Sequence, residues 1–489
     1  MPSRARAAIS GEEARRLDAN AEELGLGVER LMANAGKALA ADIRRRVGKR
    51  DAILLLCGHG NNGGDGLAAA VEMLRTGHDA RVVLARPATA MMGPGRAWLE
   101  RIPKERLAVW KGKPEPAWSN VGLVVDCLLG SGLNGKPRAP YAAIIGWVNR
   151  RRGKTTILSC DVPSGLGSAL AVRPDATLTL HAPKLGMDAK NSGRITVAPI
   201  GIPPRAVDIG IGDLRMGYPI PDAASHKGDN GRVVVAAGST PYLGAPLYCA
   251  LGAYRTGADL VHVLTPSSVA FHLRSLSPEP IVHEAGGEEL AAFATIVARP
   301  LLDRGAALLV GPGLGPGRTA RAAAQALLRL AIATKAPVVV DADGLLALDD
   351  AAMRRLAGRL VVTPHAGEFT RRFGKAATPA NVHAVAAEHG ITILCKGVRA
   401  GPGHADAVSD GTTLRLGRRG HPTMTVGGTG DVLAGSVAAL LAKGATPFSA
   451  ACAAAYLVGV AGEEAALHAS FGASPIDVAE SIPQVLLRL

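Results

Sequence analysis

Short apolar runs rich in valine, isoleucine and leucine recur along this chain, and longer stretches with helical periodicity separate them. The runs lack polar alternation, which is typical of parallel strands that are buried on both faces of a sheet. They are residues 52–57, 81–84, 122–126, 155–161, 232–236, 260–264, 307–311, 337–341, 360–363 and 391–395. Many end in Gly, Asp, Thr or Lys, which places functional groups at the carboxyl edge of an α/β sheet, where ligands bind.

Length and composition indicate more than one domain. The chain has 489 residues, too many for one ordinary core, and a length prior gives roughly two to four domains. Hydrophobic residues make up 48% of the chain but aromatic residues only 3%, so its cores must be built from Val, Leu, Ile and Ala. Residues 210–224 lack periodicity and contain several Gly and Pro residues, which is typical of a linker. We therefore predict two α/β domains, residues 1–215 and 225–489.

The charge favours small anionic ligands over nucleic acid. A formal net charge of +14 suits nucleotides and other anions. The arginines are scattered, apart from short runs at residues 44–46 and 150–152, and aromatic residues do not interleave with them. We therefore expect no nucleic-acid partner.

The cysteines and the apolar segments bear on the compartment. The six cysteines form no CxxC pair and lie mostly in apolar runs, which indicates buried free thiols in a reducing cytosol. No apolar segment follows Arg4 and Arg6, so we expect no signal peptide. An apolar helix around residues 438–442 ends at Lys443 and Gly444, which favours a core helix over a membrane span. We expect a cytoplasmic homo-oligomer without membrane contact.

A glycine-rich loop in the first half predicts a phosphate site. The apolar run 52–57 leads into residues 58–66, Gly-His-Gly-Asn-Asn-Gly-Gly-Asp-Gly, and a helical pattern starts at Leu67. Backbone N–H groups between a strand and a helix can hold an anion. Side-chain oxygens of Asn62 and Asp65 lie near that loop and suit a hard cation.

Two further strand ends in the first half carry polar groups. Asp126 ends one run and precedes a second glycine-rich loop, residues 130–135, while Asp161 and Ser164 follow another run. Parallel strands end at one edge of the sheet, so we expect Asn62, Asp126, Asp161 and Ser164 in one crevice. Each residue alone is also compatible with a turn or a helix cap.

The second half contains a glycine-rich loop that runs straight into an apolar helix. Residues 426–435 read Val-Gly-Gly-Thr-Gly-Asp-Val-Leu-Ala-Gly. The amides of such a loop carry the positive end of the helix dipole and can hold a phosphate or an oxyanion. Asp431 stands beside that anion hole, where it could take a proton from a substrate hydroxyl. The alternative is a turn with a capping aspartate.

Other strand ends of the second half add candidates. Gly313 lies in a glycine-rich turn, His365 and Lys396 follow further apolar runs, and residues 341–344 read Asp-Ala-Asp-Gly. For His365 the alternative is a helix cap or a histidine that satisfies a backbone carbonyl in the core.

The first half resembles the NAD(P)HX epimerase domain, also called the YjeF N-terminal domain, a Rossmann-like three-layer α/β sandwich. The segments that carry the resemblance are residues 31–36, 61–66, 125–126, 130–133, 161–165, 184–186 and 201–203. The resemblance implies that Asn62, Asp126 and Ser164 hold a potassium ion and that Asp161 faces the damaged nicotinamide ring. It implies nucleotide contacts from Asn61, Asn62, Gly63, Gly64, Asp65, Gly130, Ser131, Gly132, Leu133, Asn134, Gly135 and Lys136.

The second half resembles the ADP-dependent NAD(P)HX dehydratase, the YjeF C-terminal domain, a ribokinase-like three-layer sandwich. Residues 363–368 together with 427–431 carry this resemblance. It implies contacts to hydrated NAD(P)H from Ala253, Gly313, His365 and Asp431. It implies ADP contacts from Lys396, Gly397, Val398, Arg399, Ala400 and Gly430. The chain departs from the family pattern at Val458, where a histidine is common, and at residues 416–420.

The two resemblances together imply repair of hydrated NADH and NADPH. The first domain would interconvert R and S hydrates, with Asp161 as the first choice for the proton transfer and Asp65 as the second. The second would dehydrate the S hydrate with ADP, with Asp431 as the base. We expect Mg²⁺ to assist this phosphoryl transfer. AMP and phosphate would be released. The alternative is a vitamin or sugar kinase joined to a non-catalytic N-terminal binding module.

Overall fold

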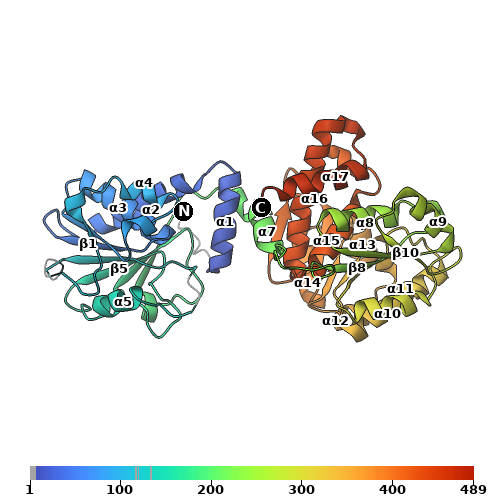
Figure 1. The fold of residues 1–489 in the computed structure, drawn as a ribbon, viewed down its shortest axis with the longest axis horizontal. Helices are drawn as coiled ribbons and strands as arrows, with labels where there is room; N and C mark the ends of the chain where they lie inside the picture. The colour runs from blue at the N-terminus through green and yellow to red at the C-terminus, as the bar shows by residue number, and fades with distance from the viewer. Residues whose placement is uncertain (1–6, 116–117, 119, 133–134) are drawn as a thin grey trace. The chain divides into compact units, whose positions relative to one another are not determined.

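The computed structural model describes residues 7–115, 118, 120–132 and 135–489. The chain forms two compact units, Met1–Ala206 and Val207–Leu489, each with a central sheet between helices (Figure 1). The predicted fold class of two α/β domains is confirmed.

The boundary differs from the predicted one. The segment that we expected to be a linker contains α7 (Ile211–Gly217), whose Ile211 and Leu214 are buried in the second unit. Asp213 of this helix pairs with Arg415 at 2.6 Å. The glycines at residues 210, 212 and 217 make the sequence of this short helix resemble a linker. Only the residues after the helix have no regular secondary structure.

The first unit is built on a seven-stranded parallel sheet in the order β3-β2-β1-β4-β5-β6-β7. The strands are β1 (Ile53–Cys57), β2 (Ala80–Leu84), β3 (Leu107–Val109), β4 (Leu123–Cys127), β5 (Thr156–Cys160), β6 (Ala176–Leu180) and β7 (Arg194–Ala198). The helices are α1 (Gly11–Glu23), α2 (Val28–Arg44), α3 (Asn61–Arg75), α4 (Gly95–Leu99), α5 (Tyr141–Asn149) and α6 (Ala189–Ser192). Helices α2 and α3 form a core with one face of the sheet, and α5 packs on the other.

The second unit has a nine-stranded sheet in the order β10-β9-β8-β11-β12-β13-β14-β15-β16. Strands β8 to β14 are parallel, and β15 and β16 are antiparallel. The strands are β8 (Arg232–Ala236), β9 (Leu260–Thr265), β10 (Ile281–Glu284), β11 (Ala307–Val310), β12 (Val338–Val340), β13 (Leu360–Val362), β14 (Thr392–Ala400), β15 (Gly403–Ser409) and β16 (Leu414–Gly417).

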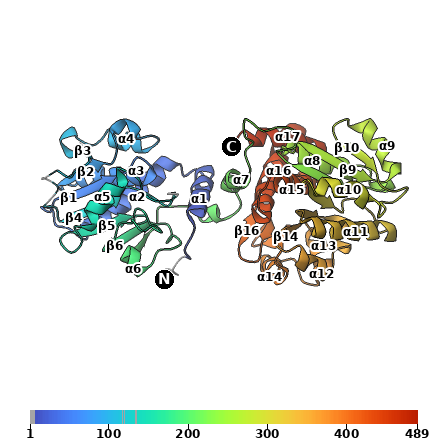
Figure 2. The ribbon, with the colours of Figure 1, turned by 60° about the horizontal axis from the view of Figure 1, so that its bottom comes forward.

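The helices of the second unit cover both faces of this sheet. Helices α8, α15, α16 and α17 gather on one face (Figure 2), and α10 to α14 form the core on the other. The helices are α8 (Ala245–Arg255), α9 (Ser267–Leu276), α10 (Ala294–Leu302), α11 (Arg318–Thr334), α12 (Asp350–Arg355), α13 (Ala366–Phe373), α14 (Pro379–His389), α15 (Thr429–Ala442), α16 (Pro447–Ala469) and α17 (Pro475–Leu486). The apolar segment Pro447–Gly472 has the length and hydropathy of a membrane span, but 78% of its most apolar window is buried in the unit, as in a core helix.

Candidate active sites

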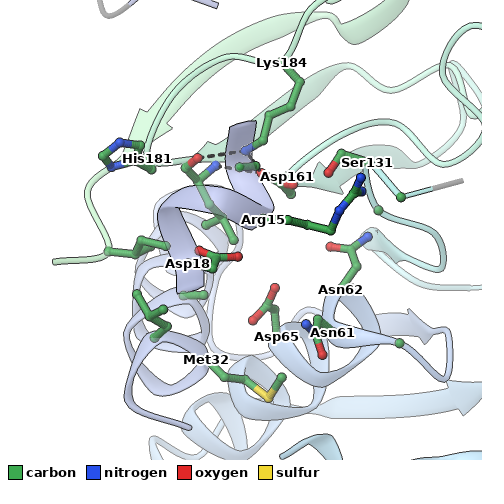
Figure 3. Close-up of a pocket in the computed structure, with 18 of the residues that line it drawn as sticks. Arg15, Asp18, Met32, Asn61, Asn62, Asp65, Ser131, Asp161, His181 and Lys184 are labelled. Atoms are coloured by element: carbon green, nitrogen blue, oxygen red, sulfur yellow. Dashed lines mark hydrogen bonds and ion pairs between the residues drawn. The ribbon is translucent and has the colours of Figure 1, made fainter. Parts of the chain in front are cut away.

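A cavity of about 490 Å³ opens at the carboxyl edge of the first sheet. Helix α1, the start of α3 and the segments after β4, β5 and β6 line it (Figure 3). Its polar lining includes Arg15, Asp18, Asn61, Asn62, Asp65, Ser131, Asp161 and Lys184. The structure thus brings together the predicted Asn61, Asn62, Asp65 and Asp161 with the loop 130–132. Leu133 and Asn134 lie outside the described residues, and Gly135 and Lys136 are exposed and do not line the cavity.

The glycine-rich segment after β1 is mostly helix, not loop. Helix α3 begins at Asn61, six residues earlier than the helical pattern starts at Leu67, and its N-cap Gly60 has no side-chain cap. A Cβ on Gly63 would lie 2.0 Å from the carbonyl oxygen of Gly58. Glycine is therefore needed so that the first turn of α3 can pack against the end of the strand, and the free N–H groups of that turn face the cavity region.

Asp161 is paired with a buried lysine. It follows β5 and has a left-handed backbone with φ 63°. Its Oδ1 accepts the Leu180 N–H at 3.1 Å and pairs with the Lys184 ammonium. Lys184 is 5% exposed and also donates to the Leu180 carbonyl oxygen at 2.8 Å. The buried ammonium and the Leu180 N–H thus fix the position of the Asp161 side chain.

Two further carboxyl groups line the same cavity, and the pKa of each is raised. Burial raises the pKa of Asp65 well above its usual value, and the charges of Asp161 and Asp18 add to that effect. Burial and then the Asp161 charge raise the pKa of Asp18 to about 6, although Lys184 opposes the shift. The cavity therefore holds two carboxyl groups whose raised pKa values suit proton exchange, beside a third that is paired with Lys184.

Asp126 lies behind the cavity in a fully buried oxygen-rich site. Its carboxylate accepts the Ser159 and Ser164 hydroxyls at 2.9 and 2.5 Å and the Ser164 N–H at 2.9 Å. Asn62 donates through Nδ2 to the Leu129 carbonyl oxygen at 3.1 Å. The Ser164 hydroxyl also contacts the Leu129 carbonyl oxygen at 3.2 Å, so that oxygen joins Asn62 to the Asp126 site.

This site fits a cation in one specific respect. The Asn62 Oδ1 atom is buried and has no hydrogen-bond partner among the described residues. Burial raises the pKa of Asp126, and its hydrogen bonds oppose the shift without a cationic side chain. No group of three or more His, Cys, Asp or Glu side chains suited to a metal occurs in the part of the chain that the structure describes. A cation here would therefore rely on amide, hydroxyl and carbonyl oxygens beside one carboxylate, which suits a hard ion.

The glycine-rich loop of the second unit forms an uncapped helix start, as predicted for an anion hole. Gly428 is the N-cap of α15 with φ 106° and no side-chain cap, so Asp431, the third residue of the helix, is not the capping residue. Burial raises the pKa of Asp431 to about 7, with further contributions from the charges of Asp341 and Glu368 and an opposing one from Lys396. Near neutral pH this carboxyl group can exchange a proton, which a capping carboxylate with an ordinary pKa could not do.

Lys396 lies against this helix start. Its ammonium donates to Asp341 Oδ1 at 3.2 Å, and a Cβ on Gly430 would lie 3.2 Å from its Nζ. The Lys396 N–H donates to the Pro364 carbonyl oxygen at 2.8 Å, which fixes β14 beside the segment that leads to His365. Lys396, Asp341, Asp431 and the amides of the loop are thus one cluster at the carboxyl edge of the sheet. A lysine that contacts the anion hole can stabilise a phosphoryl group.

Two family models match the chain. One, described as NAD(P)H-hydrate dehydratase, matches residues 233–484, and the other, described as YjeF-related protein N-terminus, matches residues 28–186. A bifunctional NAD(P)H-hydrate repair enzyme from Hyperthermus butylicus is 36% identical, and the match covers 98% of this chain and 92% of that protein. The protein of the same name from Pyrobaculum aerophilum is 38% identical, with 96% of each chain covered.

The chain belongs to the family of bifunctional NAD(P)H-hydrate repair enzymes.

Two solved structures match part of the chain. A ribokinase-like superfamily protein from Enterococcus faecalis is 24% identical over 57% of this chain and 95% of that chain, with a TM-score of 0.48. An ADP/ATP-dependent NAD(P)H-hydrate dehydratase from Bacillus subtilis is 24% identical over 56% of this chain and 95% of that chain, with a TM-score of 0.45.

One predicted contact of this repair-enzyme family member lies at a buried residue. Ala253 is fully buried in α8. A Cβ on Gly435 of α15 would lie 3.1 Å from its backbone nitrogen, so Ala253 takes part in the packing of α8 on α15, and its contact with a ligand stays a prediction. Ala245, the first residue of α8, lies beside the predicted Gly313: a Cβ on Gly313 would be 2.9 Å from the Ala245 Cβ. Counting small residues along an alanine-rich helix does not reveal which turn reaches the site.

The residues predicted to contact ADP do not all expose side chains. Along β14, Lys396 is half-buried and Gly397 and Arg399 are exposed, but the side chains of Val398 and Ala400 point into the core. Only backbone atoms of Val398 and Ala400 could contact a nucleotide. Strand alternation, which is visible in the sequence, explains this difference.

His365 forms the helix cap of the alternative interpretation, and its contact with hydrated NAD(P)H stays a prediction. Its Nδ1 accepts the Gly367 N–H at 3.0 Å and caps α13, as in the alternative interpretation. Its Nε2 lies 3.4 Å from Glu368, and the side chain is 56% exposed. The ring is therefore fixed by the cap while its other edge remains accessible to a ligand.

The departures from the family pattern have structural contacts. Val458 is buried in α16. After β16, Arg418 pairs with Asp208 at 2.9 Å and Arg419 pairs with Glu463 of α16 at 2.8 Å. These residues hold the chain that leads to the anion hole.

Sequence reasoning missed the partners that set the charge of each site. The sequence indicates Lys184 only as part of a closing segment and Asp341 only as the end of a strand, and it does not indicate Asp18. Each comes from an element distant in sequence from its partner, and no local spacing reveals such a pair.

Proposed function

We propose that this chain repairs hydrated nicotinamide nucleotides. The first unit interconverts the R and S hydrates of NADH and NADPH. The second dehydrates the S hydrate with ADP and releases AMP and phosphate. The observation that carries the proposal is the match to full-length bifunctional repair enzymes over 98% of the chain, together with a separate acid–base cluster at the carboxyl edge of each sheet.

In the second unit, Asp431 is the base. It takes the proton of the hydroxyl group on the reduced ring, and the hydroxyl oxygen attacks the β-phosphorus of ADP. The bond between that phosphorus and the bridging oxygen breaks, and AMP leaves with the electron pair. The loop amides and Lys396 stabilise the charge on the transferring group. Phosphate then leaves the ring carbon more readily than hydroxide would, and loss of a ring proton completes the reduced nicotinamide.

In the first unit, Asp161 is the leading candidate for the proton transfer, and Asp65 is the second. Epimerisation needs reversible loss and return of the hydroxyl group at the hydrated carbon. The Asp161 carboxylate, paired with Lys184, can stabilise a cationic ring or accept a proton. Asn61, Asn62 and the loop 130–132 line the same cavity and would hold the nucleotide.

Two cations complete the proposal. Asn62, Asp126 and Ser164 would hold potassium, which the partnerless Asn62 Oδ1 supports. That ion would keep the ends of β4 and β5 and the start of α3 in place. Magnesium would accompany ADP and neutralise charge on its phosphates.

The six buried free cysteines support a reducing cytoplasm as the compartment.

Product analysis distinguishes this activity from that of a vitamin or sugar kinase. The full chain is incubated with pure S hydrate of NADH, ADP and Mg²⁺. We expect one AMP and one phosphate for each NADH that appears at the reduced-nicotinamide absorbance band. A phosphorylated product that accumulates without NADH would favour the kinase.

A further inference from the structure

Helix α1 supplies the first cavity with a carboxyl group that has no assigned role. Asp18 lines the cavity and points into it together with Asp65 and Asp161 (Figure 3). The helix lies outside residues 28–186, the part of the chain that the YjeF-related model matches. The third carboxyl group is therefore contributed by an element that precedes the matched region.

Helix α1 is fixed to the rest of the unit. Asn20 donates to the Ala206 carbonyl oxygen at 2.9 Å. Just before the helix, the Ile9 N–H donates to the Pro183 carbonyl oxygen at 2.8 Å, and the Leu185 N–H donates to the Ile9 carbonyl oxygen at 2.8 Å. A Cβ on Gly11 would lie 2.6 Å from the Ser131 carbonyl oxygen. The helix is thus a wall of the cavity, joined on one side to the segment that carries Lys184 and on the other to the glycine-rich loop.

The three carboxyl groups of the cavity have different surroundings. Lys184 pairs with Asp161. Asp65 on α3 is 9% exposed, points into the cavity and has no hydrogen-bond partner among the described residues. Arg15, one turn before Asp18, extends toward Ser131, and His59 and His181 also line the cavity. Asp18 is only partly buried and Asp65 is more deeply buried, so Asp18 can exchange its proton with water more readily.

We propose that Asp18 is the proton donor of the first site and works together with the Asp161 carboxylate. This assignment rests on the proposed epimerase function. The raised pKa of Asp18, about 6, allows the group to hold a proton and to release it near neutral pH.

The step balances without a further reactant. The Asp18 carboxyl gives its proton to the hydroxyl oxygen on the hydrated carbon. The carbon–oxygen bond breaks with its electron pair on oxygen, water forms, and the lone pair of the ring nitrogen makes a carbon–nitrogen double bond. The Asp161 carboxylate stabilises the cationic ring. Water then adds to the opposite face, and the proton that it releases returns to the Asp18 carboxylate.

The test uses the full chain with Asp18→Asn and, as a matched control, Glu12→Gln on an exposed position of the same helix. R-to-S conversion is followed by chiral separation of the hydrates across a pH series, and the uncatalysed rate is subtracted. For the wild type, the rate should fall as pH rises through about 6, because the donor must be protonated. Asp18→Asn should lose about a hundredfold or more and should lack that pH dependence. Glu12→Gln should retain both.

Thermal melting of each variant, followed by circular dichroism, reports that the first unit is folded, and dehydration of pure S hydrate reports that the second unit is intact. A wild-type rate for Asp18→Asn, or a slower rate with an unchanged pH midpoint, would overturn the assignment of Asp18. A wild-type chain that does not accelerate R-to-S conversion would overturn the proposed epimerase function and the Asp18 assignment with it.

Discussion

At the scale of single residues, each site contains an aspartate with a lysine beside it. Lys184 pairs with Asp161 in the first unit. In the second, burial raises the pKa of Asp431 to about 7, and Lys396 limits the shift. The aspartate of the first site is therefore fixed by an ion pair, whereas the aspartate of the second can exchange a proton near neutral pH.

Asp431→Asn should abolish dehydration and preserve ADP binding. Asparagine has the size of aspartate but cannot act as a base, so recovery of NADH should fall by at least about a hundredfold. Loss of a negative charge beside the anion hole should leave ADP affinity, measured by calorimetry, equal or tighter. Asp303→Asn, an exposed position after α10, is the matched control. Near-normal turnover of Asp431→Asn would assign the base elsewhere, with His365 as the next candidate.

The pH dependence of dehydration follows from the same pKa. Asp431 is protonated below about pH 7 and cannot then accept the hydroxyl proton. The rate on pure S hydrate should therefore rise with pH through about 7 and reach a plateau above it. A rate that is flat from pH 6 to 8 with saturating substrate would argue against this role.

Asn62→Ala should slow R-to-S conversion and spare dehydration of S hydrate. The substitution removes the buried Oδ1 atom that has no partner among the described residues and that we assign to potassium. The wild-type conversion should respond to replacement of potassium by a bulky organic cation, and the variant should not. An unchanged conversion rate in the variant would remove Asn62 from the site.

At the scale of elements, the apolar runs predicted ten strands, and each of them is a strand in the structure. Among the other strands, β3 has only three residues, and the rest mix polar and apolar residues. β6 alternates threonine with apolar residues, and β15 contains His404 and Asp406. Such strands are stabilised by their neighbours in the sheet, and the local sequence does not specify them. The polar residues at strand ends could be predicted to meet, because parallel strands end at one edge of a sheet. The contact of α1 with them could not be predicted, because no such rule places a helix that precedes the sheet.

Close packing of α8 on α15 leads to a stability prediction. A Cβ on Gly252 would lie 2.2 Å from the Val432 carbonyl oxygen. Gly252→Ala should therefore lower the free energy of unfolding of the second unit by about 1–3 kcal/mol. Gly427, whose Cβ would meet no atom within 4 Å, provides the control: Gly427→Ala should change stability little. Equal denaturation midpoints in urea for the two variants would contradict this packing.

At the scale of the whole molecule, the chain contains two units that each have a core and a polar cluster. The predicted boundary at residue 215 cuts through α7, because a short helix with glycines at several positions resembles a linker. The side chain of Asp213 is fully buried, and its pair with Arg415 joins α7 to β16. The second unit therefore needs α7.

A fragment of residues 207–489 should fold and dehydrate S hydrate, but it should not consume R hydrate faster than the hydrate epimerises without enzyme. A fragment of residues 225–489 lacks α7 and leaves Arg415 without Asp213, so its melting temperature should be lower. Consumption of R hydrate by the longer fragment at the rate of the full chain would contradict the division of labour.

The central claim is that one chain carries both activities in separate sites. The most direct test follows NADH absorbance after ADP is added to a known mixture of R and S hydrates, with the wild type and with Asp161→Ala. The wild type should convert the whole mixture. The variant should convert the S fraction at the wild-type rate and then continue only as fast as uncatalysed epimerisation allows. Complete conversion by both proteins at one rate, or failure of Asp161→Ala to convert the S fraction, would contradict the claim.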